Sequence, residues 1–346
     1  MSGASREATG RVVGGVRGGA GVFVLADRGL VTVTGDDRER WLNGMLTGDV
    51  EALGGERNGC YALRLDRKGR ILADVHVWRR EDAYWLELAA PAVGPLLEDL
   101  DRFIIADDVT LTDRSAEFDR VAIEGPEAAA VLANVLGGEP GLADEAFRID
   151  RWGEEEVVVA AFGWSGEPAY QVAVAAGRGQ PFAAATLEAA RSAGLPVVEG
   201  DAEALEVLRV EAGIPAWGRE IDLEVFPDEA RLARAVSTTK GCYTGQEIVA
   251  RLRSRGQVNH LLVGLVFDSV DCDAPVPEDT VLRAGDRATG EVTSSVWSPS
   301  AGCIGLGYAR REHSEPGTEL AWEGGTARVV ALPMVETARE AKGSRA

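Results

Sequence analysis

Six short segments near the C-terminal end constrain the fold of this chain most. They are rich in β-branched residues, are punctuated closely by Gly and Pro, and show no helical period. This pattern is typical of a small antiparallel barrel or sandwich, and we expect it over residues 256–335. The six segments read NHLLVGLVF, TVLRA, TGEVTSSVW, CIGLGYA, ELAWEG and TARVVAL.

The chain before this region mixes strands and helices. CYALRL, RILADVHVW and AYWLEL, separated by polar turns, predict a three-stranded meander. Two strands, VFVL and LVTVT, precede it, and a helix is expected to open at Asp36, because Glu39 stands at the spacing of a capping box. Because sheets and helices alternate irregularly, the pattern favours an α+β region over residues 21–255 rather than a doubly wound parallel sheet. Further helices are expected near residues 92–103, 126–137 and 181–193.

Both ends of the chain look like tails. Residues 1–20 are rich in Gly, Ser and Arg and lack apolar periodicity, so we expect a disordered tail. The glycines there do not indicate a phosphate loop, because nothing strand-like precedes them. Residues 336–346 are expected to form a frayed C-terminal tail.

Charge and composition exclude several classes of protein. With 36 basic and 56 acidic residues the chain carries a net charge of −20, which disfavours nucleic acid or an anionic membrane as a partner of the whole surface. No apolar run approaches the length of about 20 residues that spans a bilayer. We therefore expect a soluble, cytoplasmic protein.

Cysteine and histidine are sparse. The four cysteines, Cys60, Cys242, Cys272 and Cys303, are far apart and form no C-x-x-C pair, and the chain has three histidines. A resident metal site is therefore not expected.

One predicted helix carries an acidic residue where it ends. Residues 201–212 begin with an N-cap aspartate, and Gly213 followed by Pro215 stops the helix near Glu211. A carboxylate in a last turn opposes the helix macrodipole, at a cost of about 0.3–1 kcal/mol. Glu211 is thus either a tolerated surface residue or a residue kept for binding.

Charge is segregated just after this helix. Residues 199–230 contain ten acids and two arginines, whereas residues 231–255 contain six basic residues and one acid, a local charge of +5. A solvated basic helix face would explain this window. An anion-binding rim, suited to a small carboxylated ligand, is the functional alternative.

The basic window contains the segment KGCYTGQE, residues 240–247, followed by a short predicted helix, IVARLR. Both the helix N-terminus and Lys240 would favour the thiolate form of Cys242. A reactive or ligand-donating cysteine and a cysteine that merely packs remain the two interpretations.

This segment resembles the signature of the YgfZ family, which comprises bacterial relatives of the glycine-cleavage T protein, an aminomethyltransferase, that bind folate and serve iron–sulfur cluster assembly or repair. Further blocks are similar to those of the T-protein superfamily, in the same order, so that the resemblance covers about residues 22–335. These blocks are WLNGMLTGDV (41–50), GRILADV (69–75), RVEAGIPAWGREID (209–222) and TGEVTSSVWSPSAGCIGLGYARR (289–311).

The resemblance implies a fold and a ligand. It implies a folate-binding region of two subdomains around a central channel, followed by the barrel, and tetrahydrofolate or a one-carbon derivative as ligand. Glu211 would then recognise the pterin, with Arg209 and Gly213 beside it, since a carboxylate can accept two parallel hydrogen bonds from an aminopyrimidine edge. The basic window would face the glutamyl tail. Tyr243 and Gln246 of the motif are further candidate folate contacts.

The chain departs from the aminomethyltransferases at two places. The two adjacent aspartates that they carry after the meander turn read Ala73-Asp74 here, so glycine-cleavage chemistry is in doubt, and Asp74 is kept as a candidate folate contact. In exchange the chain carries Cys242, which those enzymes lack. We assign Cys242 and Lys240 as the candidate catalytic residues and treat Cys60, Cys272 and Cys303 as structural.

Three functions follow from these features. The main hypothesis is a folate-binding accessory protein for iron–sulfur enzymes, in which Cys242 is the functional thiol and a transient cluster ligand at most, because one thiolate cannot hold a cluster alone. Its influence on tRNA modification would be indirect. The alternative is a folate-dependent one-carbon transferase, and the third is a binding module whose Cys242 only packs.

Overall fold

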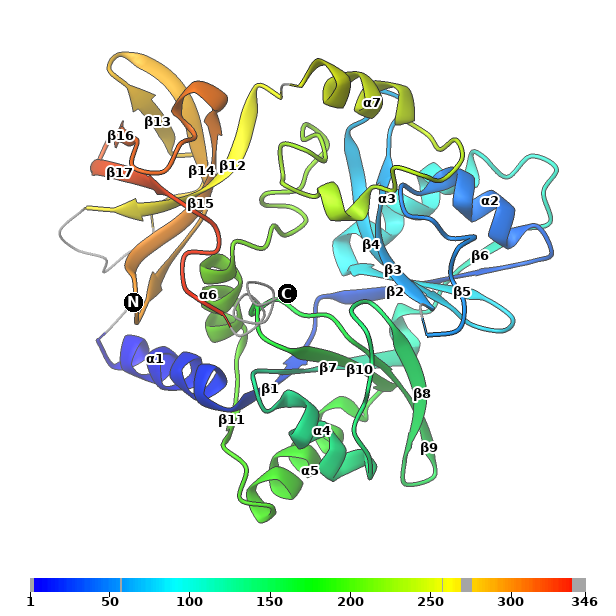
Figure 1. The fold of residues 1–346 in the computed structure, drawn as a ribbon. Coiled ribbons are helices and arrows are strands. Elements are labelled where there is room, and N and C mark those ends of the chain that lie inside the picture. Colours follow the sequence, from blue (N-terminus) through cyan, green and yellow to red (C-terminus); the bar gives the residue numbers. More distant parts are fainter. Residues whose placement is uncertain (1–2, 57, 257, 269–275, 338–346) are drawn as a thin grey trace.

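The computed structural model describes residues 3–56, 58–256, 258–268 and 276–337. They form two sheets with their helices, which make up the mixed region predicted from the sequence, and a closed barrel (Figure 1). The α+β class and the C-terminal antiparallel barrel are therefore confirmed. The remaining residues, which include most of the predicted C-terminal tail and Cys272, lie outside the described part.

The first sheet has six strands and is antiparallel apart from one edge. In spatial order it contains β11 (Val197–Glu199), β1 (Ala20–Leu25), β7 (Phe118–Glu124), β10 (Ala169–Ala175), β9 (Glu155–Ala160) and β8 (Phe147–Trp152). Only the β1–β11 pair is parallel. The helices α4 (Ala128–Leu136) and α5 (Gly179–Ser192) cover one face of this sheet, where Leu132 and Phe182 pack on Val121 and Val172.

The second sheet has five antiparallel strands and contains the predicted meander. Their order is β3 (Gly59–Leu65), β4 (Ile71–Arg79), β5 (Tyr84–Ala89), β2 (Arg28–Thr34) and β6 (Thr110–Asp113). The strands β1 and β2 follow each other in the chain but belong to different sheets. The helices α2 (Arg38–Met45) and α3 (Ala90–Asp101) pack on this sheet through Leu42 and Leu96.

The barrel consists of all six predicted C-terminal strands, in the order β12 (His260–Phe267), β15 (Gly302–Arg310), β14 (Arg287–Ser298), β13 (Val281–Ala284), β16 (Glu319–Trp322) and β17 (Gly325–Val330). Closure leaves the sheet without a free edge, which decides between the two architectures that the sequence allowed. Three short 3-10 turns, η1 (Ser115–Glu117), η2 (Ala233–Ala235) and η3 (Arg311–His313), join elements along the chain.

The prediction of a disordered tail over residues 1–20 is wrong. Residues 3–18 form helix α1 (Gly3–Gly18), which packs Val13 and Val16 against Phe23 and the helix α6 (Ala202–Ala212). One glycine of the helix also permits a close approach to β11: a Cβ at Gly15 would lie 2.5 Å from the Val198 side chain. Each helical glycine costs about 0.5–1 kcal/mol relative to alanine, so packing rather than intrinsic propensity stabilises this helix.

A second local prediction is also wrong. Helix α2 begins at Arg38, and Asp37 at its N-cap makes no side-chain cap bond. The Asp37 carboxylate instead accepts from the Asp108 N–H, and Glu39 pairs with Arg79 rather than returning to the helix start. The capping box predicted between Asp36 and Glu39 is therefore absent, because α2 starts later than expected and Arg79 pairs with the Glu39 carboxylate. By contrast, both ends of α6 form as predicted. At its start the Asp201 side chain accepts from the Ala204 N–H, and at its C-terminal end Gly213 is left-handed at φ 69°.

Candidate functional site

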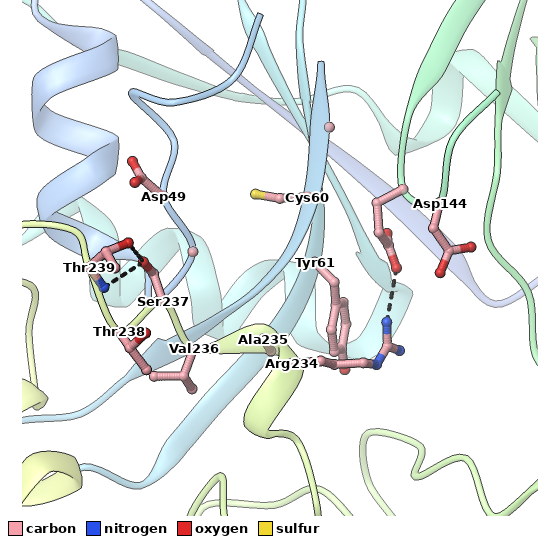
Figure 2. Close-up of a pocket in the computed structure, with 13 residues that line it drawn as sticks. Asp49, Cys60, Tyr61, Asp144, Arg234, Ala235, Val236, Ser237, Thr238 and Thr239 are labelled. Carbon is pink, nitrogen blue, oxygen red and sulfur yellow. Dashed lines mark hydrogen bonds and ion pairs between the residues drawn. The ribbon is translucent and has the colours of Figure 1, made fainter. Parts of the chain in front are cut away.

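A cavity of about 400 Å³ lies between segments that are far apart in the sequence (Figure 2). Gly48 and Asp49 follow α2, residues 59–61 begin β3, Asp144 and Glu145 precede β8, and residues 234–239 include the end of the turn η2 and the segment after it. This volume falls within the range of small-molecule sites, roughly 300–1,000 Å³. Its wall carries three carboxylates against one guanidinium, that of Arg234.

Tyr61 connects this cavity to Asp74. The tyrosine ring lines the cavity, and its hydroxyl donates to Asp74 Oδ2 at 2.9 Å. Burial, with the nearby Asp74 carboxylate, raises the pKa of Tyr61 well above its ordinary value, so the phenol remains a donor. The candidate contact Asp74 is thus half-buried beside the cavity wall and held by a neutral hydroxyl.

The alanine that precedes Asp74 faces the opposite way. Successive side chains of a strand point to opposite faces, and Ala73 packs with Val75 and Val77 in the core of the second sheet. A carboxylate at position 73 would be directed into that core. Of the two positions, the chain therefore keeps its carboxylate at Asp74, on the face of β4 that meets Tyr61.

Lys240 anchors the motif instead of pointing into the cavity. Its Nζ donates to the backbone oxygens of Asn43, Leu46 and Gly48 at 2.5, 2.8 and 2.6 Å. These three bonds use all three N–H groups of an ammonium. Burial lowers the pKa of Lys240 to about 8, opposed by the nearby Asp49 and Cys60. The block 41–50 and the motif 240–247, which are distant in the sequence, thus meet at this amine.

The residues just before Lys240 line the cavity, whereas the motif residues after it do not. Ser237, Thr238 and Thr239 line the cavity, whereas Cys242 is exposed and precedes α7 (Gln246–Arg255), the helix predicted after the motif. Tyr243 is buried, with its ring 5.6 Å from Lys240 Nζ, and burial raises its pKa. The half-buried Gln246 is the first residue of α7; like Cys242 and Tyr243, it does not line this cavity.

Glu211 is fully buried where α1, α6 and the barrel meet. Its Oε2 accepts from Arg17 Nη2 at 2.8 Å, and its Oε1 accepts from the Ser298 hydroxyl at 2.6 Å. Arg17 also pairs with Glu167 at 2.6 Å. Glu211 does not line the cavity that contains Tyr61, so the structure does not bring Glu211 together with the other candidate contact, Asp74, at that cavity.

Arg209 is saturated with protein partners. Its five N–H groups make five hydrogen bonds, to the two carboxylate oxygens of Glu206, to Glu220, to the Ile214 carbonyl and to the Ser294 hydroxyl. It therefore joins α6 to the following loop and to the barrel strand β14.

The described basic side chains of the window are paired, most of them with acids or carbonyls from outside it. Of its basic residues with described side chains, only Arg234 lines the cavity, where it pairs with Glu145 at 3.1 Å. The other partners are the Leu262 carbonyl for Arg231, the backbone oxygens for Lys240, Glu247 for Arg251 and Asp228 for Arg253. The window is therefore not a continuous rim of free cations.

Sequence reasoning missed two parts of the cavity. Cys60, which we expected to be structural, lines the wall, whereas Cys303 lies in the barrel core as expected. The pair Asp144 and Glu145 was also missed, because a loop before an edge strand carries no periodic signal. The one available sign was the position of Cys60 next to Tyr61, on the strand paired with Asp74.

Two negative findings limit the chemistry. Within the described ranges, no cluster of three or more His, Cys, Asp or Glu side chains is arranged to hold a metal ion. No helix in that same part of the chain is long and apolar enough to cross a membrane.

Comparison with known proteins identifies the family. The GCVT N-terminal domain model matches residues 5–240, and the glycine cleavage T-protein C-terminal barrel domain model matches residues 261–336. An aminomethyltransferase of Shouchella clausii is 32% identical over 316 residues, covering 88% of this chain and 82% of the relative. One of Streptomyces avermitilis is 30% identical over 311 residues, with the same two coverages.

A solved structure agrees in fold. The glycine cleavage system aminomethyltransferase T from Bartonella henselae superposes with a TM-score of 0.82 at 24% identity, covering 95% of this chain and 90% of that one. Together the matches cover both the mixed region and the barrel. The chain therefore belongs to the glycine cleavage T-protein family.

Proposed function

We propose that this chain binds a tetrahydrofolate in the cavity around Tyr61 and transfers a one-carbon unit of the aminomethyl type. The observation that carries the proposal is the Tyr61–Asp74 pair, which places a half-buried carboxylate beside a cavity of ligand size. The relatives named aminomethyltransferase support the same reaction class.

The residues present fit a folate. Asp49, Asp144 and Glu145 offer acceptors for the N–H groups of an aminopyrimidine edge, and the exposed side of Arg234 can pair with a carboxylate of the tail. The hydroxyls of Ser237, Thr238 and Thr239 add neutral donors and acceptors along one wall. Bound tetrahydrofolate would supply the nitrogen that accepts the one-carbon unit.

Asp74 supplies the proton transfer that this reaction needs. Transfer from an aminomethyl donor would form two carbon–nitrogen bonds to the folate and break two bonds of the donor carbon, one to the leaving amine and one to the group that carries it, with no redox change. Of the two protons lost from the accepting nitrogens, one would pass through Asp74 to the departing ammonia and the other would go to the released carrier group. A positioned carboxylate in such a role contributes roughly 100- to 10,000-fold in rate.

A turnover assay tests the reaction. Purified protein with an aminomethyl donor should consume tetrahydrofolate over many cycles, and Asp74→Asn should reduce the rate by about 100-fold or more. Consumption that stops at one equivalent per protein contradicts the transferase and leaves only binding.

Thiol labelling tests the location. In the Cys242→Ser protein, 5-formyltetrahydrofolate should slow alkylation of Cys60, which lines the cavity. In the Cys60→Ser protein the same ligand should leave alkylation of the exposed Cys242 nearly unchanged. Equal protection of both thiols, or of neither, contradicts this placement.

A second function is favoured by the exposed thiol of Cys242 in the YgfZ-like motif. In this alternative the folate-bound protein is an accessory factor for iron–sulfur enzymes, and Cys242 contacts a cluster or a partner transiently. Its effect on tRNA modification would pass through such an enzyme. In a strain that lacks the protein, Cys242→Ser should then fail to restore activity of a cluster enzyme under oxidative stress, whereas Cys60→Ser should restore it.

A further inference from the structure

A buried histidine lies behind the cavity wall, directly beside Tyr61. His76 stands opposite Tyr61 in the β3–β4 ladder, and the two ring centroids are 4.9 Å apart. The ring of Phe162, in the segment that follows β9 of the first sheet, stacks on His76 with the ring centroids 3.6 Å apart. His76 is 7% exposed and does not line the cavity, so it lies between the two sheets rather than in contact with a ligand.

Glu145 connects this histidine to the cavity. His76 Nδ1 lies 2.6 Å from Glu145 Oε2, and Arg234 Nη1 donates to Glu145 Oε1 at 3.1 Å. Burial opposes ionisation of Glu145, but His76 and Arg234 outweigh it and keep its pKa below the ordinary value. Because an ionised carboxylate only accepts hydrogen bonds, the Nδ1 of His76 must carry the proton and donate.

Both partners of Glu145 also contact Tyr61. The Arg234 guanidinium lies 4.5 Å from the centre of the Tyr61 ring, and the His76 ring is its neighbour in the ladder. Tyr61 in turn donates to Asp74. Figure 2 shows Arg234 reaching from below Tyr61 toward the Asp144–Glu145 segment. One carboxylate thus fixes two groups that confine the ring of Tyr61.

The backbone at Glu145 adopts a conformation that needs support. Its φ is 65°, in the left-handed region, which costs a residue other than glycine on the order of 1–3 kcal/mol. The chain approaches so closely that a Cβ at Gly59 would lie 2.1 Å from the Glu145 carbonyl oxygen. In this conformation the Glu145 carboxylate reaches both His76 and Arg234.

We propose that His76 is a positioning residue for the Tyr61–Asp74 pair: it acts through Glu145 and the ring of Tyr61 and does not touch the ligand. Nearby, Glu87 stands opposite His76 on β5, but Arg120 and Arg28 already pair with that carboxylate. The Nδ1 donor is therefore directed to Glu145 alone among these acids. The activity test of this inference rests on the proposed function.

Two substitutions separate the hydrogen bond from the ring. His76→Phe keeps an aromatic ring against Tyr61 and Phe162 but removes the donor, whereas His76→Asn keeps a donor near the position of Nδ1. We expect His76→Phe to lower kcat at least about tenfold, since small displacements of reacting groups are costly, with the Kd of 5-formyltetrahydrofolate changed less than about threefold. His76→Asn should restore most of the rate. His313→Phe, in the η3 turn of the barrel, is the control for loss of a histidine.

A crystal structure of the His76→Phe protein gives a readout without ligand. The Tyr61 hydroxyl should move beyond hydrogen-bond distance of Asp74, about 3.5 Å. A retained Tyr61–Asp74 bond, an unchanged kcat, or a His76→Asn protein as impaired as His76→Phe would each overturn the proposal. If the unmodified protein shows no turnover, the proposed function fails, and the Tyr61–Asp74 distance alone decides the role of His76. If His76→Phe does not fold, the Tyr61–Asp74 distance is measured in the Glu145→Gln protein instead.

Discussion

Replacing Lys240 by methionine distinguishes an anchor from a catalytic amine. The Lys240 ammonium makes three hydrogen bonds to the backbone oxygens of Asn43, Leu46 and Gly48. A hydrogen bond contributes about 1 kcal/mol net, so loss of the three bonds to these buried residues predicts a destabilisation of about 3 kcal/mol. Methionine preserves most of the apolar stem, so the change isolates the amine.

The assay is urea denaturation followed by tryptophan fluorescence. The Lys240→Met protein should unfold at a lower urea concentration with an unchanged slope, while Lys68→Met, at an exposed turn position, should shift the free energy of unfolding by less than about 0.5 kcal/mol. Wild-type stability of Lys240→Met together with abolished turnover would refute the anchoring argument and restore Lys240 as a catalytic residue. Loss of both stability and Cys242 reactivity would agree with an anchor that positions the motif.

Three further changes test the network around the cavity and the barrel. Arg17→Met leaves the Glu211 and Glu167 carboxylates buried without their shared cation and should destabilise by about 3–5 kcal/mol in urea, whereas Arg11→Met on the same helix, in an exposed pair, should cost less than about 1 kcal/mol. Gly59→Ala forces a Cβ to 2.1 Å from a carbonyl oxygen and should lower the melting temperature by the equivalent of about 1–3 kcal/mol, while Gly54→Ala meets nothing within 4 Å and serves as its control. The pKa of Glu145 is lowered in the folded state, so this carboxylate stabilises the fold above the unfolded pKa of 4.5, and that stabilisation is lost as the pH falls through the folded pKa. The Glu145→Gln protein should therefore have a smaller free energy of unfolding at pH 7, and that free energy should fall less steeply in acid than in the unmodified protein. Parallel curves of unfolding free energy against pH for the two proteins would contradict this.

The elements that sequence predicted well are those with a strong local signal. The six barrel strands carry their own β-branched pattern, and α6 has both a capping aspartate and a stopping glycine, so each was located to within a few residues. Helix α1 was missed because Val13 and Val16 are too few apolar residues among its glycines to show a helical period. Their burial depends on Phe23 and α6, which are distant in the sequence or not part of the helix.

The candidate site shows the same division. The motif and its neighbouring helix were recognised from sequence, but the partners that determine each side chain's role come from distant segments. Lys240 is held by a loop about 190 residues earlier in the chain, and Arg234 by Glu145 from the edge of another sheet. Counting charges along the sequence identified the excess of basic residues at 231–255. It could not show that acids and carbonyls from outside this window pair with several of those residues, as Asp228 does with Arg253 and the Leu262 carbonyl with Arg231.

The position of Lys240 also relates the two candidate functions to each other. Residues 237–239 line the cavity. Lys240, the next residue, binds the Gly48 carbonyl in the loop that carries Asp49, and Cys242 is exposed two residues further on. A ligand that contacts the cavity wall therefore touches the same short segment that presents the thiol. One-carbon transfer in the cavity and a thiol contact at the surface then use opposite ends of one anchored segment, so loss of the anchor should impair both. Cys60→Ser alters the cavity wall and Cys242→Ser the exposed thiol, so each of these changes should affect only one of the two functions.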